Sequence, residues 1–223
     1  MKQWTTLIAA AALCPGNLIA ASPSPTPPES AANKYMHQTS IEQLAAHFED
    51  PGRKKWQKPD EVIAGLGPLA GKTVADIGAG TGYFSFPIAA RGAKVIAIDI
   101  DQRFLDYIEA RKQKEKTKGE IEVRRTTPDS PGLKPGEADV ILIVDTWHHI
   151  EDHPSYLKKL REALLRGGTL VIIDFKKEET PEGPPPELRL TAAEVQSELH
   201  AAGFKIASTD EKTLPYQYII KAR

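Results

Sequence analysis

The sequence predicts an α/β protein built on a doubly wound, mostly parallel sheet with helices on both of its faces. Short apolar runs rich in β-branched residues, which are typical of buried parallel strands, alternate with segments of helical length. This alternation favours a parallel sheet that helices cover on both sides. The last two strand signals have no helix between them, so we expect them to pair as an antiparallel hairpin at one edge of the sheet.

Two short helices are expected before the first strand. Ser40 can cap a helix over residues 41–48, whose apolar positions recur at helical spacing, and the stretch DPGRKKWQKP then interrupts it. A second short helix is expected over residues 60–65. These elements form a helical cap, residues 34–70, on the domain that we assign to residues 34–223.

The first two strands are expected at TVADI, residues 73–77, and at KVIAIDI, residues 94–100. The segment GYFSFPIAARG between them has helical length and ends at Gly92. Asp101 begins the next expected helix, whose basic end, EARKQKEKTKG, is typical of a water-facing surface rather than of a binding patch.

The second half of the chain continues the alternation. Three strand signals, EIEVRR, ADVILIVD and GTLVIIDF, are followed by the final pair, FKIASTDEKT and LPYQYIIKAR. Helices are expected over residues 153–166 and 191–202, each of which ends before a glycine.

The composition disfavours several kinds of partner and site. Acidic and basic residues nearly cancel, with a formal net charge of -1, so no broad cationic surface can follow a nucleic-acid backbone. The single cysteine, Cys14, cannot form an internal disulfide and lacks the partners of a structural zinc site. With 40% hydrophobic residues, one substantial core can hold the fold.

The N-terminus predicts a secretory signal over residues 1–22: one lysine, a short apolar stretch and small residues, before a Pro- and Ser-rich linker over residues 23–33. The apolar stretch is broken at residues 15–17 and is too short to span a membrane, which needs ~20 apolar residues. We therefore expect an exported protein of the bacterial periplasm. The alternatives are an uncleaved tether or a disordered tail, and without a working leader the protein would stay in the cytoplasm. The oligomeric state is left open.

A glycine-rich turn follows the first strand, where the crevice of an open parallel sheet binds its ligands. Glycines there let the backbone approach a ligand and adopt conformations that a side chain would forbid. A dinucleotide fingerprint, G-x-G-x-x-G, would place its third glycine at Tyr83. The chain instead has Asp76-x-Gly78-x-Gly80-x-Gly82, which disfavours an NAD(P)-dependent oxidoreductase but still predicts a nucleotide-like ligand.

Two further acids suit the recognition of a nucleoside. Asp99 ends the second strand, where a carboxylate can accept hydrogen bonds from both hydroxyls of a ribose. Asp129, after the third strand, is well placed to accept a hydrogen bond from an adenine amino group. The alternative for Asp129 is a turn-stabilising acid next to Pro128.

Five motifs resemble, in order and spacing, the class I S-adenosylmethionine-dependent methyltransferases: VADIGAGTGYFS, VIAIDID, TTPDSPGL, VILIVDTWHHIED and LREALLRGGTLVIIDF. The likeness covers residues 62–220 and is closest to the small-molecule branch that includes quinone-biosynthesis-type enzymes. It implies a seven-stranded sheet whose last strand is antiparallel, and S-adenosyl-L-methionine as the cofactor.

The resemblance also implies roles for individual residues. The glycine turn would hold the methionine and ribose portions of the cofactor, Asp99 the ribose hydroxyls and Asp129 the adenine. Asp76 would help to orient the amino acid end, and Ile100 would pack on the adenine ring with Ser130 beside it. The implied cofactor-binding set is Asp76, Gly78, Ala79, Gly80, Gly82, Asp99, Ile100, Asp129, Ser130 and Asp145.

The fourth strand ends at Asp145 and delivers TWHHI to the same crevice, so the catalytic candidates are Asp145, His148 and His149. Either histidine could act as a general base, because imidazole titrates near neutral pH. At least one of them could instead pack or cap the loop. A metal site that includes His153 is disfavoured, because the spacing matches no standard zinc motif, and we expect no metal.

The sequence therefore predicts methyl transfer to a small, partly aromatic or apolar molecule rather than to nucleic acid. The cofactor supplies an activated methyl group, so the protein must align the nucleophile, exclude water and accept a proton. Candidate pocket walls are Tyr35, Phe48 and Trp56 of the cap and the loop after the fifth strand, which Pro184 to Pro186 would stiffen. The alternative is an exported S-adenosylmethionine- or nucleoside-binding protein without turnover.

Overall fold

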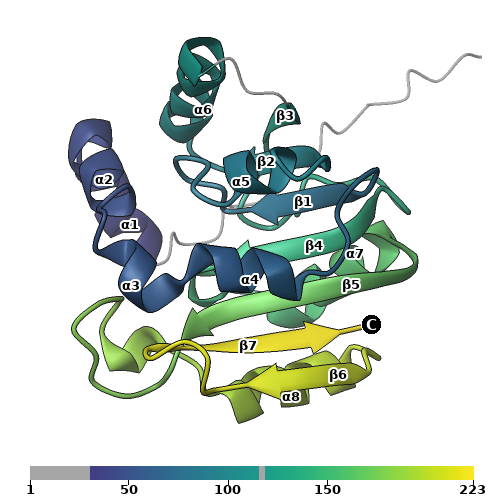
Figure 1. The fold of residues 1–223 in the computed structure, drawn as a ribbon. Helices are drawn as coiled ribbons and strands as arrows, with labels where there is room; N and C mark the ends of the chain where they lie inside the picture. Colours follow the sequence, from purple (N-terminus) through teal and green to yellow (C-terminus); the bar gives the residue numbers. More distant parts are fainter. Residues whose placement is uncertain (1–30, 116–118) are drawn as a thin grey trace, which may run out of the picture.

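The computed structural model describes residues 31–115 and 119–223 (Figure 1). The expected secretory signal, residues 1–22, lies outside the described residues, as does the linker up to residue 30. Residues 31–33, which the sequence assigned to the linker, form the first turn of helix α1, Ala31–Gln38. The helical cap therefore begins before residue 34.

A seven-stranded sheet runs through the molecule in the order β3-β2-β1-β4-β5-β7-β6 (Figure 1). The first five strands pair in parallel, whereas β7 is antiparallel to both β5 and β6. This confirms the mostly parallel sheet and the antiparallel hairpin at its edge. The strands are β1 Thr73–Ile77, β2 Lys94–Asp99, β3 Glu120–Arg125, β4 Ala138–Val144, β5 Leu164–Phe175, β6 Ile206–Asp210 and β7 Gln217–Ala222.

Helices connect the parallel strands, and short helices precede the first one. Ser40 caps α2 as expected, since its hydroxyl accepts a hydrogen bond from the backbone N–H of Gln43 at 3.3 Å. The stretch DPGRKKWQKP, expected only to break this helix, contains a helix of its own, α3. The remaining helices are α2 Ile41–Phe48, α3 Arg53–Gln57, α4 Pro59–Gly65, α5 Ser85–Ala89, α6 Gln102–Glu115, α7 His153–Ala163 and α8 Ala192–Ala201, with short 3₁₀ turns η1 Trp147–His149 and η2 Pro186–Leu188.

The helix expected over residues 153–166 ends earlier, because α7 stops at Ala163 and β5 begins at once. The last carbonyls of α7, those of Glu162 and Ala163, accept hydrogen bonds from the loop before β4. Leu164 then pairs with Ala138, and the register shifts before Val140. Neighbouring strand pairing thus overrides the helical pattern of the residues after Ala163.

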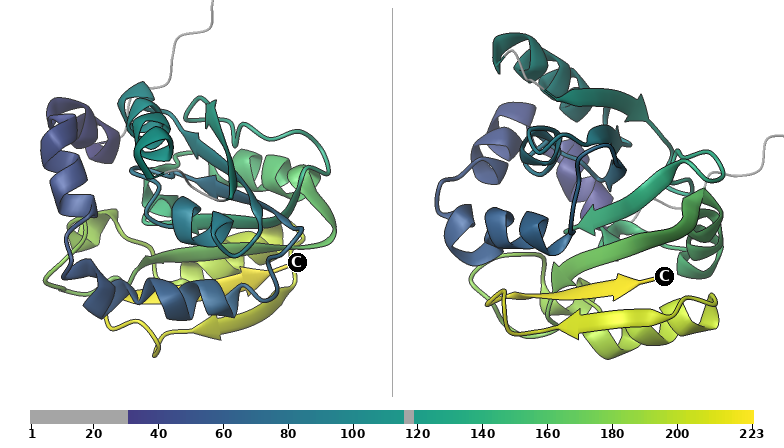
Figure 2. Two further views of the ribbon diagram at one scale, coloured as in Figure 1. Left: turned by 45° about the horizontal axis from the view of Figure 1, so that its top comes forward. Right: turned by 45° about the vertical axis from the view of Figure 1, so that its right-hand side comes forward.

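Two apolar cores fill the two faces of the sheet. Successive strand residues point to opposite faces, so Val74 belongs to one core and Ala75 to the other. Helices α4 to α6 cover the first face, and the fully buried Ile108 of α6 belongs to its core. Helices α7 and α8 cover the second face, and Leu160 of α7 and Val195 of α8 belong to that core (Figure 2).

The cap helices α1 to α3 lie at the end of the sheet where the parallel strands end (Figures 1 and 2). Ligands of open parallel sheets bind at this end. The cap therefore stands over the expected crevice. No helix in the described ranges has both the length and the hydropathy needed to cross a membrane.

Candidate active site

The turn between β1 and α5 is the centre of the candidate site. Gly78, Gly80 and Gly82 have φ of +72°, +53° and +80°, values at which a side chain is strained. A Cβ atom on Gly78 would lie 2.6 Å from Cγ2 of Thr146, so the turn packs directly on the loop after β4. Backbone conformation and close packing both require glycine at Gly78, and Ala79 beside it is buried.

Two buried carboxyl groups flank this turn. Asp76, in β1, accepts a hydrogen bond from Oγ of Ser85 at 2.6 Å. Asp99, at the end of β2, accepts from the N–H groups of Gly80 at 2.9 Å and of Asp101 at 3.0 Å. Burial disfavours the charged form and raises the pKa of both carboxyl groups to about 6. A cationic ligand would stabilise these two charges.

Asp145 brings a third carboxyl group to the site. It follows β4 with φ of +52°, which is unusual for a residue other than glycine. Its carboxylate accepts from Nε2 of Gln57 at 2.8 Å, from Nη2 of Arg53 at 3.3 Å, and from the side-chain amide of Gln217. Desolvation raises the pKa of Asp145 to about 6, although the Arg53 guanidinium works in the opposite direction. Asp145 thus ties the cap to the end of β4 and the start of β7.

Two hydroxyl groups of the glycine turn have no hydrogen-bond partner among the described residues. Oγ1 of Thr81 and the hydroxyl of Tyr83 are both buried atoms. Buried polar atoms are normally paired. These hydroxyls and the acids at both sides of the turn provide the donors and acceptors that a nucleoside bearing an amino acid would use, so the residues present fit such a ligand.

The cap covers the glycine turn with an aromatic ring and a cation. A Cβ atom on Gly80 would lie 3.4 Å from the ring of Phe48, the last residue of α2. The guanidinium of Arg53 lies 4.2 Å from the ring centroid of Tyr83, within the range of a cation–π interaction. Phe48 therefore stands where a pocket wall was expected.

The other two aromatic residues expected in the walls have different positions. Trp56 lies 5.7 Å from Phe175, the last residue of β5, and 6.0 Å from Tyr216, just before β7, between ring centroids. The side chain of Tyr35 lies outside the described residues.

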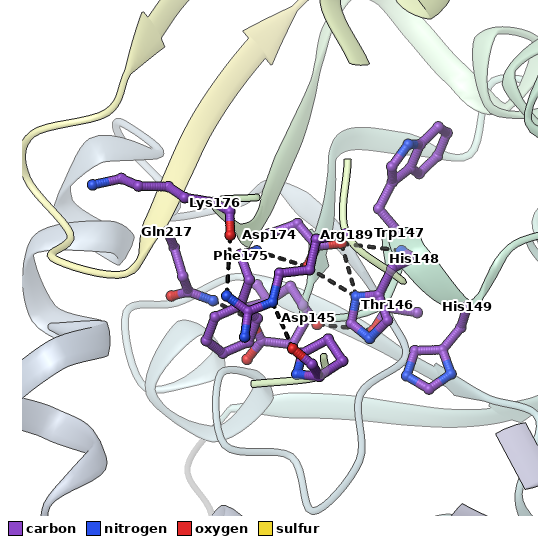
Figure 3. A network of polar contacts seen from close by, with 12 residues as sticks. Asp145, Thr146, Trp147, His148, His149, Asp174, Phe175, Lys176, Arg189 and Gln217 are labelled. Carbon is purple, nitrogen blue, oxygen red and sulfur yellow. Dashed lines mark hydrogen bonds and ion pairs between the residues drawn. The ribbon is translucent and has the colours of Figure 1, made fainter. Parts of the chain in front are cut away.

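His148 forms a hydrogen-bonded pair with Asp174, the acid near the end of β5 (Figure 3). Its Nδ1 lies 2.9 Å and 3.1 Å from the two carboxylate oxygens, and its backbone N–H donates to Oδ2 at 3.0 Å. The second ring nitrogen, Nε2, has no hydrogen-bond partner among the described residues. Burial acts to lower the pKa of His148, but the Asp174 carboxylate outweighs it and the pKa is raised.

His149 has a different environment, although its ring centroid lies only 4.4 Å from that of His148. Its Nδ1 lies 2.8 Å from the side-chain oxygen of Asn33 in α1. Burial, with the neighbouring His148, lowers the pKa of His149 to about 3. His149 is therefore a neutral contact between the η1 turn and the cap.

The loop after β3 lies beside Asp99, because the N–H of Thr126 donates to the Asp99 carbonyl at 3.0 Å. Asp129 is exposed on this loop and accepts from Oγ1 of Thr127 at 2.6 Å, a bond that lowers its pKa. Ser130 is half-buried and uses its carbonyl to accept from Oγ1 of Thr126. Among the described residues, no contact joins the Asp129 carboxylate to the glycine turn. Ile100, the residue expected to pack on the adenine ring, is half-exposed and directly follows Asp99.

The loop after β5 is organised by one buried arginine, Arg189. Its guanidinium donates to the carbonyls of Pro184 at 2.6 Å, Glu178 at 2.7 Å and Lys176 at 3.0 Å. It also lies 5.1 Å from the ring centroid of Phe175 (Figure 3). The loop expected to form a pocket wall is therefore held in one conformation next to Asp174.

Sequence reasoning missed several residues of this site. Asp174 had a readable signal, because it lies at or next to the last residue of an apolar strand, as Asp76 and Asp99 do. Arg53 and Gln57 had no such signal, since they lie in a polar stretch with no motif.

His153 interacts with Glu198 at 3.0 Å, and the described residues contain no group of three or more potential metal ligands.

The comparisons with known proteins agree with this geometry. A family model described as "Methyltransferase domain" matches residues 75–172. The chain is 32% identical over 145 residues to a ubiquinone biosynthesis O-methyltransferase of Cereibacter sphaeroides, covering 62% of this chain and 53% of that protein. It is 34% identical over 128 residues to a tRNA U34 carboxymethyltransferase of Shewanella amazonensis, covering 56% of this chain and 38% of that protein. The chain thus spans about half or less of the length of these curated relatives.

A solved structure matches over nearly its whole length. It is described as a SAM-dependent methyltransferase from Aquifex aeolicus, is 27% identical and superposes with a TM-score of 0.75. The match covers 82% of this chain and 98% of that one.

Proposed function

We propose, from the premise that this chain belongs to the class I S-adenosylmethionine-dependent methyltransferases, that it transfers a methyl group from S-adenosyl-L-methionine to a hydroxyl group of a small molecule. One observation carries the proposal: a glycine turn with left-handed backbone conformation packs between the buried carboxyl groups of Asp76 and Asp99, beneath a helical cap. This geometry favours a ligand with a ribose and a positive charge.

The residues of the turn suit the parts of this cofactor. Asp99 would accept from the ribose hydroxyls, and Asp76 would face the amino acid end. There the hydroxyls of Thr81 and Tyr83, which have no hydrogen-bond partner among the described residues, would supply further polar contacts. When bound, the cofactor supplies a methyl group on a positively charged sulfur. The raised pKa values of Asp76, Asp99 and Asp145 support a cationic ligand, because its charge would offset the cost of ionising them.

Among the three catalytic candidates we assign the proton-accepting role to His148. Support comes from its Nε2, which has no partner among the described residues, and from its pairing with Asp174. His149 is a poor base, since its pKa lies at about 3, and its role is to hold α1 through Asn33. Asp145 serves to fasten the cap through Arg53.

A small acceptor is favoured over nucleic acid. The net charge of -1 offers no broad cationic surface for a phosphate backbone, and the cap helices stand over the end of the sheet where the glycine turn lies (Figure 1). The relative named as an O-methyltransferase supports oxygen as the receiving atom.

Isothermal titration of the full chain tests the cofactor. We expect S-adenosylmethionine and S-adenosylhomocysteine to bind and NADH, the control nucleotide, not to bind. Absence of binding by both adenosyl ligands at millimolar concentration would refute the proposal. Transfer of a labelled methyl group to a member of a phenol panel then separates an enzyme from a binding protein.

We also propose export, which depends on residues 1–22 alone. N-terminal sequencing of protein from fractionated cells tests it: a periplasmic chain that begins near residue 23 supports export, and a cytoplasmic chain that keeps residue 1 refutes it.

A further inference from the structure

A cluster of three side chains, none of which the proposed reaction uses, joins η1 to the helices α7 and α8. His153, the first residue of α7, lies between Glu198 of α8 and Trp147 of η1. Its ring stacks on the indole ring of Trp147, with 4.4 Å between the centroids and 20° between the planes. The carboxylate of Glu198 lies 3.0 Å from Nδ1 of His153 and accepts from Nε1 of Trp147 at 3.3 Å.

Both nitrogens of the His153 ring face an oxygen that accepts hydrogen bonds. Nδ1 faces the Glu198 carboxylate, and Nε2 lies 3.2 Å from the backbone carbonyl oxygen of Trp147. A neutral imidazole has a single N–H group, so it could make one of these bonds and would set two lone pairs against each other at the other contact. Glutamate is a stronger acid than imidazolium, so a second proton belongs on the ring rather than on the carboxyl group. The geometry is therefore that of an imidazolium, which donates at both nitrogens.

The carbonyl that His153 contacts belongs to the peptide group just before His148. A peptide group is planar, so its C=O and N–H move together. The N–H of this group, that of His148, donates to Oδ2 of Asp174 at 3.0 Å (Figure 3). The carbonyl also accepts from the N–H of Ile150 at 3.1 Å, within the turn itself. His153 and Asp174 thus hold one peptide plane at its two edges, and this plane sets where the His148 side chain begins.

The cluster is largely shielded from water. Trp147 is fully buried, and the side chains of His153 and Glu198 are 11% and 28% exposed. The bond to the carboxylate joins two charged groups, whereas the bond to the carbonyl has a charge on one side only, and charge-assisted bonds are the stronger ones. When the ring loses a proton, the remaining proton therefore stays on Nδ1. The bond that is lost is the one to the Trp147 carbonyl.

The other titratable groups of the elements around the ring have environments of their own. His148 and His149 of η1 are each engaged with the partners described above. Asp152, the residue before α7, accepts from a backbone N–H of the first turn at 3.1 Å. Burial raises the pKa of Tyr218 in β7, and nearby carboxylates, that of Glu198 among them, add to the effect, so this phenol stays neutral. Glu198 is thus the group that stabilises the charge of the ring.

We propose that His153 is a positioning residue: its imidazolium holds the peptide group before His148, and loss of the proton on Nε2 to solvent releases that group. The inference rests on the proposed function only for the role of His148 as the proton acceptor. Since imidazole titrates near neutral pH, η1 is held most firmly in mild acid and loosens as pH rises. A histidine that does not touch the reacting atoms thus makes the placement of His148 depend on pH.

The first test reads the ring protons directly. In nitrogen-15 spectra of the full chain at pH 5, both ring nitrogens of His153 should be protonated. As the pH rises, the proton on Nε2 should be lost and the proton on Nδ1 should remain. A neutral ring at pH 5, or a neutral ring that keeps its proton on Nε2, would overturn the inference.

Amide hydrogen exchange at His148 measures the release of the peptide group. Exchange is expressed as a protection factor, so that the intrinsic pH dependence of the exchange rate cancels. In the wild type this protection should fall by about 10-fold from pH 5 to pH 8, which corresponds to one hydrogen bond. The pair of His148 and Asp174 can affect the same amide, so the relevant quantity is the ratio between each variant and the wild type at the same pH.

Glu198→Gln should remove the pH dependence without removing the contacts. The amide group of the variant can donate to Nδ1, and its oxygen can accept from the indole of Trp147, while a neutral His153 ring donates from Nε2 to the carbonyl. Protection at pH 8 should therefore exceed that of the wild type by about 10-fold. His153→Phe keeps a ring stacked on Trp147 but has no N–H group, so its protection should be about 10-fold below that of the wild type at pH 5 and close to it at pH 8.

Glu194→Gln is the matched control. It removes the same charge from α8 one turn before Glu198, and a glutamine can still form the capping box with Thr191. Its protection factors should follow those of the wild type at every pH. If Glu198→Gln keeps the wild-type pH dependence, or if Glu194→Gln abolishes it, the role assigned to His153 is wrong.

Activity gives a second readout, for a phenol that the wild type methylates. The ratio of kcat for Glu198→Gln to kcat for the wild type should rise by about 10-fold from pH 5 to pH 8, and a constant ratio would overturn the positioning role. Equal affinity of all variants for S-adenosylhomocysteine is the control for intact folding. The spectra and the exchange need no substrate, so they decide the role of His153 even where absence of S-adenosylhomocysteine binding refutes the proposed function.

Discussion

Asp76→Asn should stabilise the protein relative to wild type, and this gain in unfolding free energy should be larger at neutral pH than in acid. The Asp76 carboxyl is 3% exposed, and its pKa is raised from 3.8 to about 6 because burial disfavours the charge. Its closest partner is Oγ of Ser85, at 2.6 Å. An asparagine has nearly the same shape, and its side-chain oxygen can still accept from Ser85, but it cannot ionise.

The size of the effect follows from the two pKa values. A carboxyl group whose pKa is higher in the folded state favours folding below its unfolded value and loses that contribution as pH rises through its folded value. The difference between 3.8 and about 6 corresponds to a loss of about 3 kcal/mol in total. About 1.4 kcal/mol of this falls between pH 5 and pH 8.

Urea unfolding at pH 5, 6, 7 and 8, followed by circular dichroism, measures the effect. Asp99 and Asp145 titrate in the same range, so the relevant quantity is the difference between wild type and Asp76→Asn at each pH. We expect the variant to gain about 1.4 kcal/mol relative to wild type from pH 5 to pH 8. Asp139→Asn is the control and should show no such gain, because the Asp139 pKa is lowered.

The precision of unfolding free energies extrapolated from urea is about 0.5 kcal/mol. If the difference in unfolding free energy between wild type and Asp76→Asn changes by less than this from pH 5 to pH 8, the reasoning is refuted. A variant that loses stability relative to wild type as pH rises would also refute it. If the reasoning holds, the same variant should bind S-adenosylmethionine more weakly, because a buried negative charge has been removed from the site. The buried charge of Asp76 would then lower the stability of the protein and strengthen ligand binding.

Three further predictions concern the turn and the cap. Asp99→Ala should weaken S-adenosylhomocysteine binding by at least about 10- to 150-fold, the range for losing one of its two charged hydrogen bonds to the ribose. An unchanged dissociation constant in calorimetry would exclude the ribose role. Gly78→Ala should cost about 2–5 kcal/mol of unfolding free energy, from backbone strain and from the clash with Thr146. Gly67→Ala is the matched control: with φ of +86° and no atom within 4 Å of the added Cβ, it should lose only the strain, about 1–2 kcal/mol of unfolding free energy. If urea unfolding gives the same loss for Gly67→Ala and Gly78→Ala, the clash with Thr146 is excluded. Arg53→Gln removes the ion pair between α3 of the cap and Asp145, so amide hydrogen exchange should become faster in α2 and α3 and stay unchanged in the sheet. Unaltered exchange in α2 and α3 would show that the cap does not depend on this ion pair.

The sheet and the centre of the site could be predicted from local patterns in the sequence. Short strand signals marked all seven strands, and the glycine turn with Asp76 and Asp99 marked the ligand-binding end, because each signal lies within a few consecutive residues. The boundaries were less certain: α7 stops at Ala163, since pairing with β4 begins at Leu164. A helical pattern in the sequence carries no information about a neighbouring strand.

The chemistry beside the cofactor turn was decided by tertiary contacts. The motif TWHHI presented two equivalent histidines, and only the fold distinguishes them: His148 meets Asp174, 26 residues away, whereas His149 meets Asn33, 116 residues away. Arg53 likewise reaches Asp145 across 92 residues. The sequence by itself determined which strands form and which ligand class the turn accepts, because local periodicity and backbone conformation encode both. Which side chains share a proton or a charge was decided by distances between segments that are far apart in the chain.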